Sequence, residues 1–263
     1  MPLAALTIAG SDSGGGAGIQ ADLKTFAAHG VYGTCAVTAV TAQNTTGVRL
    51  IHELPADVVA AQIDAVLDDI EIHAVKIGML ASAAIVRAVV TRLSDRPQAN
   101  VVLDPVIAAT SGARLLTPEA VAILRSDLLP LARVVTPNAE EAGVLTGLTV
   151  SGVADARRAA ERLRALGASA VIVTGGHLDE RDAVDVICDD SGCLELRGPR
   201  VEARPSHGTG CTFAAAVAAN LAHAHPLRAS AELAKHYVAD ALRHTVAIGR
   251  GRSPLDHFWN RHR

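Results

Sequence analysis

Aromatic side chains and lysines are scarce in this 263-residue chain. Phe, Tyr and Trp together make up 2% of the residues and hydrophobic residues 49%, so the core must be built from Ala, Val, Leu and Ile. Lysine occurs only at Lys24, Lys76 and Lys235, no stretch is rich in Lys and Arg, and the net charge is −3. This charge pattern argues against nucleic acid and against an anionic membrane surface as partners.

Several motifs are also absent. The four cysteines (Cys35, Cys188, Cys193 and Cys211) form no C-x-x-C pair, so we expect neither a zinc site nor a disulfide framework. No Gly-Lys pair occurs, which excludes a P-loop. No apolar run approaches the roughly 18 residues of a membrane span. Residues 1–12 lack the basic start of a signal peptide, so we expect a cytoplasmic protein.

Apolar, β-branched runs alternate with amphipathic helical stretches along the chain. Strands are predicted at 4–10, 34–40, 72–78, 100–106, 133–138 and 170–176, and helices at 55–70, 82–94, 117–132 and 153–167. Residues 182–198 predict a hairpin that turns at Asp-Asp-Ser-Gly, and two helices follow Gly208. This alternation is typical of an α/β protein with three α/β/α layers and a mostly parallel central sheet, here as one domain over residues 1–263.

Polar, glycine-rich and proline-rich residues follow the predicted strands where each one ends. Examples are Gly10, Gln43, Asp104, Asn138 and Thr174. In open parallel sheets, ligands bind beyond the carboxyl ends of the strands. The sequence therefore predicts a cleft at this edge of the sheet.

A first glycine-rich segment, "GSDSGGGAGIQAD" at 10–22, follows the first predicted strand. It does not fit a dinucleotide fingerprint, because Ile19 stands where the third glycine would be needed. The glycines allow the backbone to approach a ligand closely, and Asp22 lies one turn into the following helix. An ordinary tight strand-to-helix turn is the alternative interpretation.

A second glycine segment, Gly208-Thr209-Gly210-Cys211, directly precedes an alanine-rich helical run. Backbone N–H groups at a helix start form an anion site, which the helix dipole strengthens. The same position should lower the pKa of Cys211 and favour its thiolate. The alternative is a helix capped by Thr209 with a small buried cysteine.

A third segment, "TPNAEEA" at 136–142, places Asn138 and Glu141 three residues apart at a predicted helix start. An Asn and a carboxylate on one face of the first turn could hold Mg²⁺ through water. The alternative is a polar helix start whose acids are favoured by the dipole.

Taken in order, these segments resemble the ribokinase-like superfamily of small-molecule kinases. Within it, the chain is most similar to the hydroxymethylpyrimidine/phosphomethylpyrimidine kinases of thiamine biosynthesis. The resemblance covers 7–33, "AVTAQNT", "KIGML", "VVLDPV", "TPNAEEA", "TGGH", "HGTGC" and "PLDHFW". It implies ATP-dependent phosphorylation of an aminopyrimidine alcohol and then of its monophosphate, with Mg²⁺, in a homodimer.

The resemblance also implies roles for individual residues. The pyrimidine would lie between Gly10, Ala17, Asp22, Gln43, Met79 and Val106. Gln43 suits an aminopyrimidine because its carboxamide both donates and accepts hydrogen bonds. Asp22 would accept a hydrogen bond from the substrate.

On the phosphate side, the resemblance gives the amides of Gly208, Thr209 and Gly210 the role of holding the transferred phosphoryl group. Cys211 would be the catalytic base, or the group nearest the nucleophile. Mg²⁺ would be held by Asn138 and Glu141 together with Asp104. Thr174 stands where relatives often carry a lysine beside the nucleotide, and Lys235 is a candidate for supplying the missing charge.

The second transfer requires additional donors for the phosphate already on the acceptor. His207 and the free amides near it are candidates. Two other functions stay open: a pyridoxal kinase, which shares the fold and the chemistry, and a non-catalytic pyrimidine-binding sensor.

Overall fold

A nine-stranded sheet runs through the centre of the protein. The computed structural model describes residues 2–108, 112, 115–176, 181–201, 206–245 and 247–260. The sheet order is β3 (Gly47–Glu53), β2 (Tyr32–Asn44), β1 (Ala4–Asp12), β4 (Ala74–Ile77), β5 (Val101–Leu103), β6 (Val134–Val135), β7 (Val171–Val173), β8 (Ala183–Asp189) and β9 (Gly192–Gly198). The six central strands of this order, β2, β1, β4, β5, β6 and β7, are parallel. Antiparallel pairings flank them, with β3 at one edge and β8 and β9 at the other.

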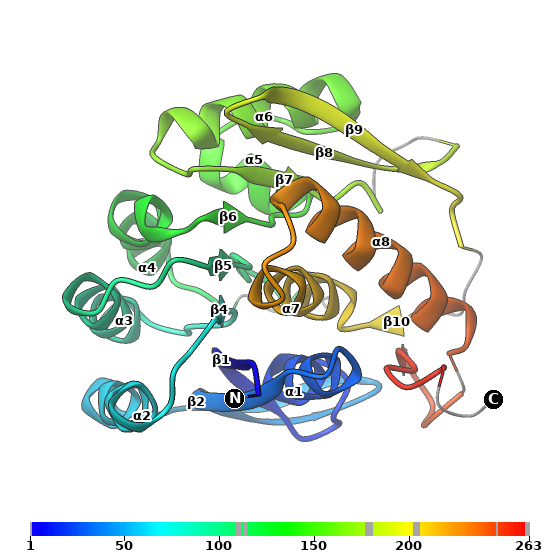
Figure 1. The fold of residues 1–263 in the computed structure, drawn as a ribbon. Helices are drawn as coiled ribbons and strands as arrows, with labels where there is room; N and C mark the ends of the chain where they lie inside the picture. The colour runs from blue at the N-terminus through cyan, green and yellow to red at the C-terminus, as the bar shows by residue number, and fades with distance from the viewer. Residues whose placement is uncertain are drawn as a thin grey trace.

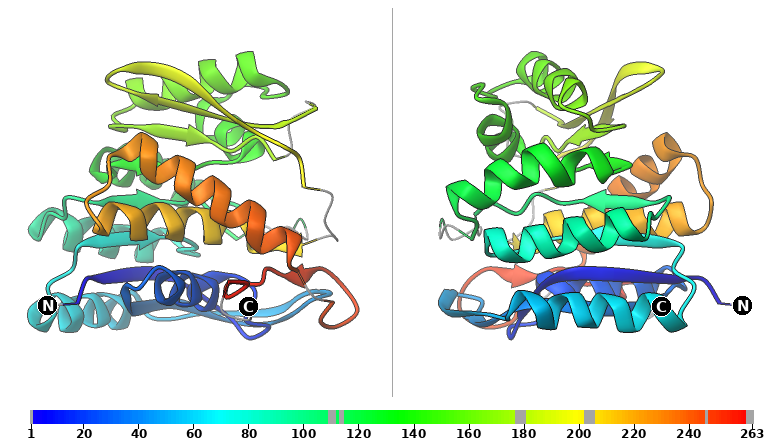
Figure 2. Two further views of the ribbon diagram at one scale, coloured as in Figure 1. Left: turned by 45° about the vertical axis from the view of Figure 1, so that its right-hand side comes forward. Right: turned by 90° about the vertical axis from the view of Figure 1, so that its left-hand side faces the viewer.

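Helices cover both faces of this sheet (Figures 1 and 2). One layer holds α1 (Gly18–Ala28), α7 (Thr209–Ala222) and α8 (Leu227–Arg243). The other holds α2 (Ala56–Asp69), α3 (Ala83–Asp95), α4 (Pro118–Ile123), α5 (Ala139–Thr146) and α6 (Val153–Ala165). After α4 the chain continues helically through Leu124–Leu128 and Leu129–Leu131, so the predicted helical stretch 117–132 is confirmed.

Successive side chains of each strand point to opposite faces of the sheet, so the core consists of two clusters, one on each face. Leu6 and Ile8 of β1 face the α2–α6 layer, while Ala5 faces α1 and α7. Small residues dominate α7, which is buried along most of its length between the sheet and α8. Alanine lets this helix approach the sheet closely, which explains how a core with few aromatic residues is filled.

The β8–β9 hairpin corrects one expectation. Its turn after Asp189 is the predicted one, and the register places Cys188 directly opposite Cys193, where the two form a disulfide with Cα atoms 4.1 Å apart. We expected no disulfide framework, and this one disulfide was missed because that expectation considered only C-x-x-C spacing and not cross-strand neighbours. Cys35 and Cys211 are free thiols.

A short two-stranded parallel sheet brings the carboxyl-terminal region beside the main one. Its strands are β10 (Ser206–His207) and β11 (Ser253–Pro254). Because β10 leads directly into α7, the carboxyl-terminal segment lies next to the start of that helix (Figure 1). In the part of the chain that the structure describes, no helix combines the length and apolar character needed to cross a bilayer.

Candidate active site

The two glycine segments contact each other, although about 190 residues separate them. Gly208 is the N-cap of α7 and has φ +85°, and a Cβ at this position would overlap the carbonyl oxygen of Gly16. Gly18 has φ +56°, and its Cβ would overlap the carbonyl oxygen of Gly10. Glycine is therefore required at both contacts by conformation and by space.

The N–H groups of the first turn are already occupied. The carboxylate of Asp12, at the end of β1, accepts hydrogen bonds from Gly14 (2.8 Å), Gly16 (3.0 Å) and Ala17 (2.9 Å). Lys24 donates to the carbonyl oxygen of Gly15 at 2.7 Å. This turn is thus closed by the protein's own carboxylate and does not offer its amides to a phosphate.

The second turn has a different environment. The first N–H groups of a helix have no acceptor within the helix, and the first turn of α7 contains no acidic residue. Thr209, Gly210 and Cys211 line a cavity of about 630 Å³. The geometry therefore leaves an anion site at the start of α7.

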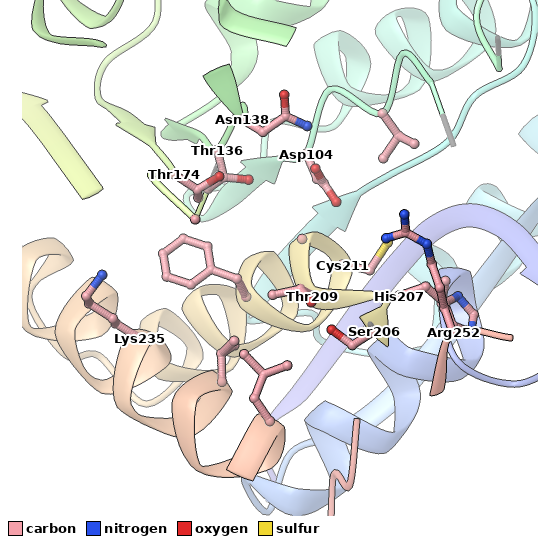
Figure 3. A pocket seen from close by; sticks show the side chains of 18 of the residues that line it. Asp104, Thr136, Asn138, Thr174, Ser206, His207, Thr209, Cys211, Lys235 and Arg252 are labelled. Atoms are coloured by element: carbon pink, nitrogen blue, oxygen red, sulfur yellow. The ribbon is translucent and has the colours of Figure 1, made fainter. Parts of the chain in front are cut away.

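This cavity collects nearly all of the predicted site residues. Asp104, Thr136, Asn138 and Thr174 lie along one side of it, and Thr209, Cys211 and His207 lie along the other (Figure 3). The predicted residues that line it are Gly10, Ala17, Gln43, Met79, Asp104, Val106, Asn138, Glu141, Thr174, Gly208, Thr209, Gly210, Cys211 and Lys235. Gln43 and Cys211 thus open onto the same space.

The end of the cavity near β1 and β2 combines apolar and amide groups. A Cβ on Gly10 would lie 3.1 Å from Sδ of Met79, so glycine leaves this thioether accessible. Thr41 Oγ1 lies 3.2 Å from Oε1 of Gln43, and the backbone of Gln43 is held by Ser13 Oγ. A flat, hydrogen-bonding ring fits this combination of groups.

Asp22 does not line the cavity, which corrects its prediction as a direct substrate contact. Its side chain is fully buried and accepts hydrogen bonds from Thr7 Oγ1 (2.6 Å) and Lys76 Nζ (3.0 Å). Burial raises the pKa of this carboxyl group, while Lys76 and Thr7 oppose the shift. Asp22 therefore lies behind the site, as the partner of a buried lysine.

Lys76 is a residue that the sequence reasoning missed. It points from β4 toward the α1 and α7 layer, is fully buried, and lies 3.0 Å from Asp22 and 3.8 Å from Asp104. Burial alone would lower the pKa of Lys76, but Asp22, Cys211 and Asp104 together raise it. A lysine inside an otherwise apolar strand was the available signal, because a buried ammonium group needs anionic partners.

Cys211 corrects a second expectation. Burial raises the pKa of its thiol to about 12, while Lys76 lowers this pKa and Asp104 and Asp22 raise it. The N–H of Gly18 donates to its sulfur, and the thiol in turn donates to Asp104. The predicted thiolate was wrong because burial of the thiol, the largest influence on its pKa, disfavours the charged form.

Asn138 and Glu141 form a capping box at the start of α5. The backbone N–H of each is 2.9 Å from a side-chain oxygen of the other. Burial and the charge of Asp104 raise the pKa of Glu141 to about 8, and burial raises that of Asp104 to about 6. The helix-start interpretation is thus correct, and it leaves two buried carboxyl groups facing the same space.

These groups fit a divalent cation. Oδ2 of Asp104 is buried with no hydrogen-bond partner among the described residues. No group of three His, Cys, Asp or Glu side chains within those ranges is arranged for a metal. Mg²⁺ keeps most of its water and needs few protein ligands, so two carboxylates and an amide oxygen suffice.

At the other end of the cavity, Asp185 of β8 connects two segments of the chain by hydrogen bonds. It accepts hydrogen bonds from Lys235 Nζ and from the backbone N–H of Gly175, both at 2.8 Å. Thr174 is anchored through its N–H to the carbonyl oxygen of Pro137. His177, the last residue of the "TGGH" motif, lies outside the described residues.

The comparisons with known proteins agree with this geometry. The family model described as "Phosphomethylpyrimidine kinase" matches residues 12–256. The chain belongs to this family. A hydroxymethylpyrimidine/phosphomethylpyrimidine kinase of Rhizobium meliloti is 49% identical to it over 98% of both chains.

Solved structures of the family and of a related kinase share the fold. An ADP complex of Bacillus subtilis pyridoxal kinase covers 100% of both chains with a TM-score of 0.92 and 36% identity. A phosphomethylpyrimidine kinase from Clostridium difficile has a TM-score of 0.82 and 40% identity, covering 91% of this chain and 99% of that one. The predicted family and the ribokinase-like α/β/α fold are confirmed.

Proposed function

We propose that this chain transfers the γ-phosphoryl group of ATP to 4-amino-5-hydroxymethyl-2-methylpyrimidine, and then to the monophosphate so formed, in thiamine diphosphate biosynthesis. The family match and the curated relative support this function. The observation that carries it is the shared cavity, because Gln43 and Cys211 line one space. An acceptor on Gln43 therefore lies within reach of a phosphoryl group on α7.

In this reaction the pyrimidine ring lies between Met79 and Val106 and forms hydrogen bonds with the carboxamide of Gln43. The hydroxymethyl oxygen attacks the γ-phosphorus, its proton passes to solvent or to a phosphate oxygen late in the transfer, and ADP leaves with the electrons of the broken P–O bond. The amides of Gly208, Thr209 and Gly210 hold the charge that develops on the phosphoryl oxygens. Thr174 and Lys235 lie on the nucleotide side.

Cys211 is adjacent to the nucleophile in this proposal. Its thiol is protonated near neutral pH, so it positions the hydroxyl group by hydrogen bonding and is not a thiolate before the transfer. A loose transition state needs little help from a base until late in the transfer. A protonated thiol is compatible with that order of events.

Mg²⁺ completes the site. Asp104, Glu141 and Asn138 are the residues that would hold it, and it would supply positive charge to the nucleotide phosphates. The ADP complex of the Bacillus subtilis pyridoxal kinase supports a nucleotide in this fold. The raised pKa values of Asp104 and Glu141 support a cation beside them.

The proposal extends to assembly and location. We place the enzyme in the cytoplasm as a homodimer, with residues 1–263 as one domain built around the nine-stranded sheet. The β2–β3 edge of that sheet exposes Val40 and Leu50 on the same face, which supports a contact between copies there. Light scattering on Leu50→Glu, with Val58→Glu on α2 as the exposed control, tests this edge.

The decisive experiment measures ATP consumption with the aminopyrimidine alcohol, its monophosphate and pyridoxal side by side. We expect turnover of both pyrimidines, with the diphosphate as the final product. A large preference for pyridoxal would favour the alternative function, a pyridoxal kinase, which the similar structure of the Bacillus subtilis enzyme suggests. Pyrimidine binding without ATP consumption would indicate a sensor.

A further inference from the structure

The second transfer presents a problem that the first does not. Its acceptor already carries a phosphate dianion, which must be placed beside a second anion, the γ-phosphoryl group. Such an arrangement requires a positive charge on the acceptor side. The question is which basic side chain of the cavity supplies it.

Most of the basic side chains near the cavity already have an acceptor. Lys235 is paired with Asp185 and Arg243 with Asp240. Lys76 is buried between Asp22 and Asp104. Arg200 donates to the carbonyl oxygen of Gly176. None of these cations is free to receive a new dianion without giving up an existing partner.

Arg252 differs from them. It lines the same cavity, and across residues 2–108, 112, 115–176, 181–201, 206–245 and 247–260 no carboxylate pairs with its guanidinium group. Figure 3 places Arg252 on the side of Cys211 and His207, and Lys235 at the opposite end. The unpaired charge therefore lies at the acceptor end, away from Lys235.

The backbone that carries Arg252 is firmly held. Its N–H donates to the carbonyl oxygen of Thr45 at 2.8 Å, and the N–H of Gly251 to Thr45 Oγ1 at 3.2 Å. The next residue, Ser253, pairs with Ser206 in the β10–β11 ladder. The position of Arg252 is thus fixed from both sides, while its guanidinium group has no hydrogen-bond acceptor among the residues that the structure describes. Binding a phosphate there orders only one side chain.

His207, the candidate from the sequence, cannot supply this charge at neutral pH. It is buried against Gly16, and burial lowers the pKa of its ring, as does the neighbouring Arg252, while Asp12 opposes the shift. A neutral imidazole can still share a hydrogen bond with a phosphate oxygen. The positive charge must come from elsewhere.

We propose that Arg252 binds the phosphate of the monophosphorylated acceptor and so determines specificity for the second transfer. This inference rests on the proposed function. In that step, an ionised oxygen of the acceptor phosphate attacks the γ-phosphorus and forms a new P–O–P bond. The bond from the γ-phosphorus to the bridging oxygen breaks, and ADP leaves with its electron pair. No proton has to be removed.

The test compares Arg252→Gln with wild type and with Arg250→Gln, a nearby exposed arginine that does not line the cavity. We expect kcat/KM for the monophosphate to fall about 10- to 100-fold in Arg252→Gln, the size of a lost charge-assisted hydrogen bond. For the alcohol we expect a change below about 3-fold. Arg252→Lys keeps the charge and should recover part of the loss, and Arg250→Gln should match wild type.

Equal losses on both acceptors would overturn the proposal, because they would show that Arg252 only holds the carboxyl-terminal segment in place. No loss on the monophosphate would overturn it too.

If wild type failed to phosphorylate the alcohol, the proposed function would fall. Calorimetric binding of the monophosphate without nucleotide would still test Arg252. Weaker binding of the monophosphate alone in Arg252→Gln would support the proposal, and unchanged binding would contradict it.

Discussion

The two glycine turns of this protein differ in where their N–H groups are directed. In the first turn, Asp12 accepts three backbone hydrogen bonds, so an anion from the chain itself fills the turn. In the second, the first turn of α7 contains no acidic residue and faces the cavity. Glycine content alone therefore does not identify a phosphate site. A turn whose amides already donate to a carboxylate of the same chain, as in the first turn, is closed to a phosphate.

The largest expected effect comes from Gly208→Ala, which forces the two turns apart. The new Cβ would overlap the carbonyl oxygen of Gly16 at a residue with φ +85°. We expect kcat to fall at least about 100-fold, because a shift of about 1 Å in a positioned group costs that much.

Gly210→Ala is the matched control. Its Cβ would meet only the Asp104 oxygens, at 4.0 Å, so we expect less than about a 10-fold change in kcat. Steady-state kinetics and circular dichroism on both variants measure the difference. Wild-type activity in Gly208→Ala would mean that the contact between the turns is unnecessary.

Asp12→Ala should have the next largest effect, because it leaves the first turn without its internal anion. Three N–H groups lose their acceptor, which costs about 2–4 kcal/mol of unfolding free energy. We expect KM for the pyrimidine alcohol to rise about 10-fold. Asp12→Asn keeps one oxygen acceptor and should lie between Asp12→Ala and wild type. Thermal unfolding and kinetics measure both effects, and an unchanged unfolding temperature would contradict this role of Asp12.

Cys211→Ala separates the two transfers. The alcohol has a hydroxyl proton to release, whereas the monophosphate attacks through an ionised oxygen. We expect kcat to fall about 10-fold for the alcohol and less than about 3-fold for the monophosphate, with small changes in KM. Equal effects on the two acceptors would remove Cys211 from any role at the hydroxyl group.

The smallest expected effect is on the pH dependence of stability. The folded-state pKa of Glu141, about 8, lies above its ordinary value of 4.5. Its protonated form therefore stabilises the fold fully below pH 4.5, and this contribution is lost as the pH rises to about 8.

Without metal, we expect the unfolding temperature to fall as the pH rises across this range, and Mg²⁺ with nucleotide to restore it most at high pH. Glu141→Gln should flatten the profile, because a glutamine side chain does not titrate. Glutamine can still form the capping box, so the helix start is kept. Thermal unfolding from pH 5 to 8.5 measures this, and an unchanged profile in Glu141→Gln would assign it to another group.

The sequence predicted the three layers and the edge of the sheet where the site lies. Continuous apolar runs such as "AVIVTGG" indicate strands that are buried on both faces, and the glycines at the end of the run mark where the strand stops. It also predicted which residues line the cavity, with Asp22 as the exception. The partner of Asp22 is Lys76, 54 positions further along the chain. A single sequence does not show such a pairing before the strands are aligned side by side.

Electrostatics was the weakest part of the sequence interpretation. The start of a helix favours a thiolate locally, but burial of the Cys211 thiol opposes it, and so do the carboxyl groups of Asp104 and Asp22, which come from other elements. The role of Asp12 was missed too, although an Asp just before a glycine run is a common acceptor for turn amides. At Cys211 the deciding factor is burial, which depends on the tertiary fold, whereas the Asp12 contacts are local, two to five residues along the chain.

The most direct test of the convergence of the two turns is a crystal structure with the aminopyrimidine alcohol, a non-hydrolysable ATP analogue and Mg²⁺. We predict the ring within hydrogen-bonding distance of the Gln43 carboxamide and the γ-phosphate on the amides at Gly208–Cys211. A γ-phosphate seated instead on the amides of Gly14–Ala17, or a ring bound outside this cavity, would contradict the account.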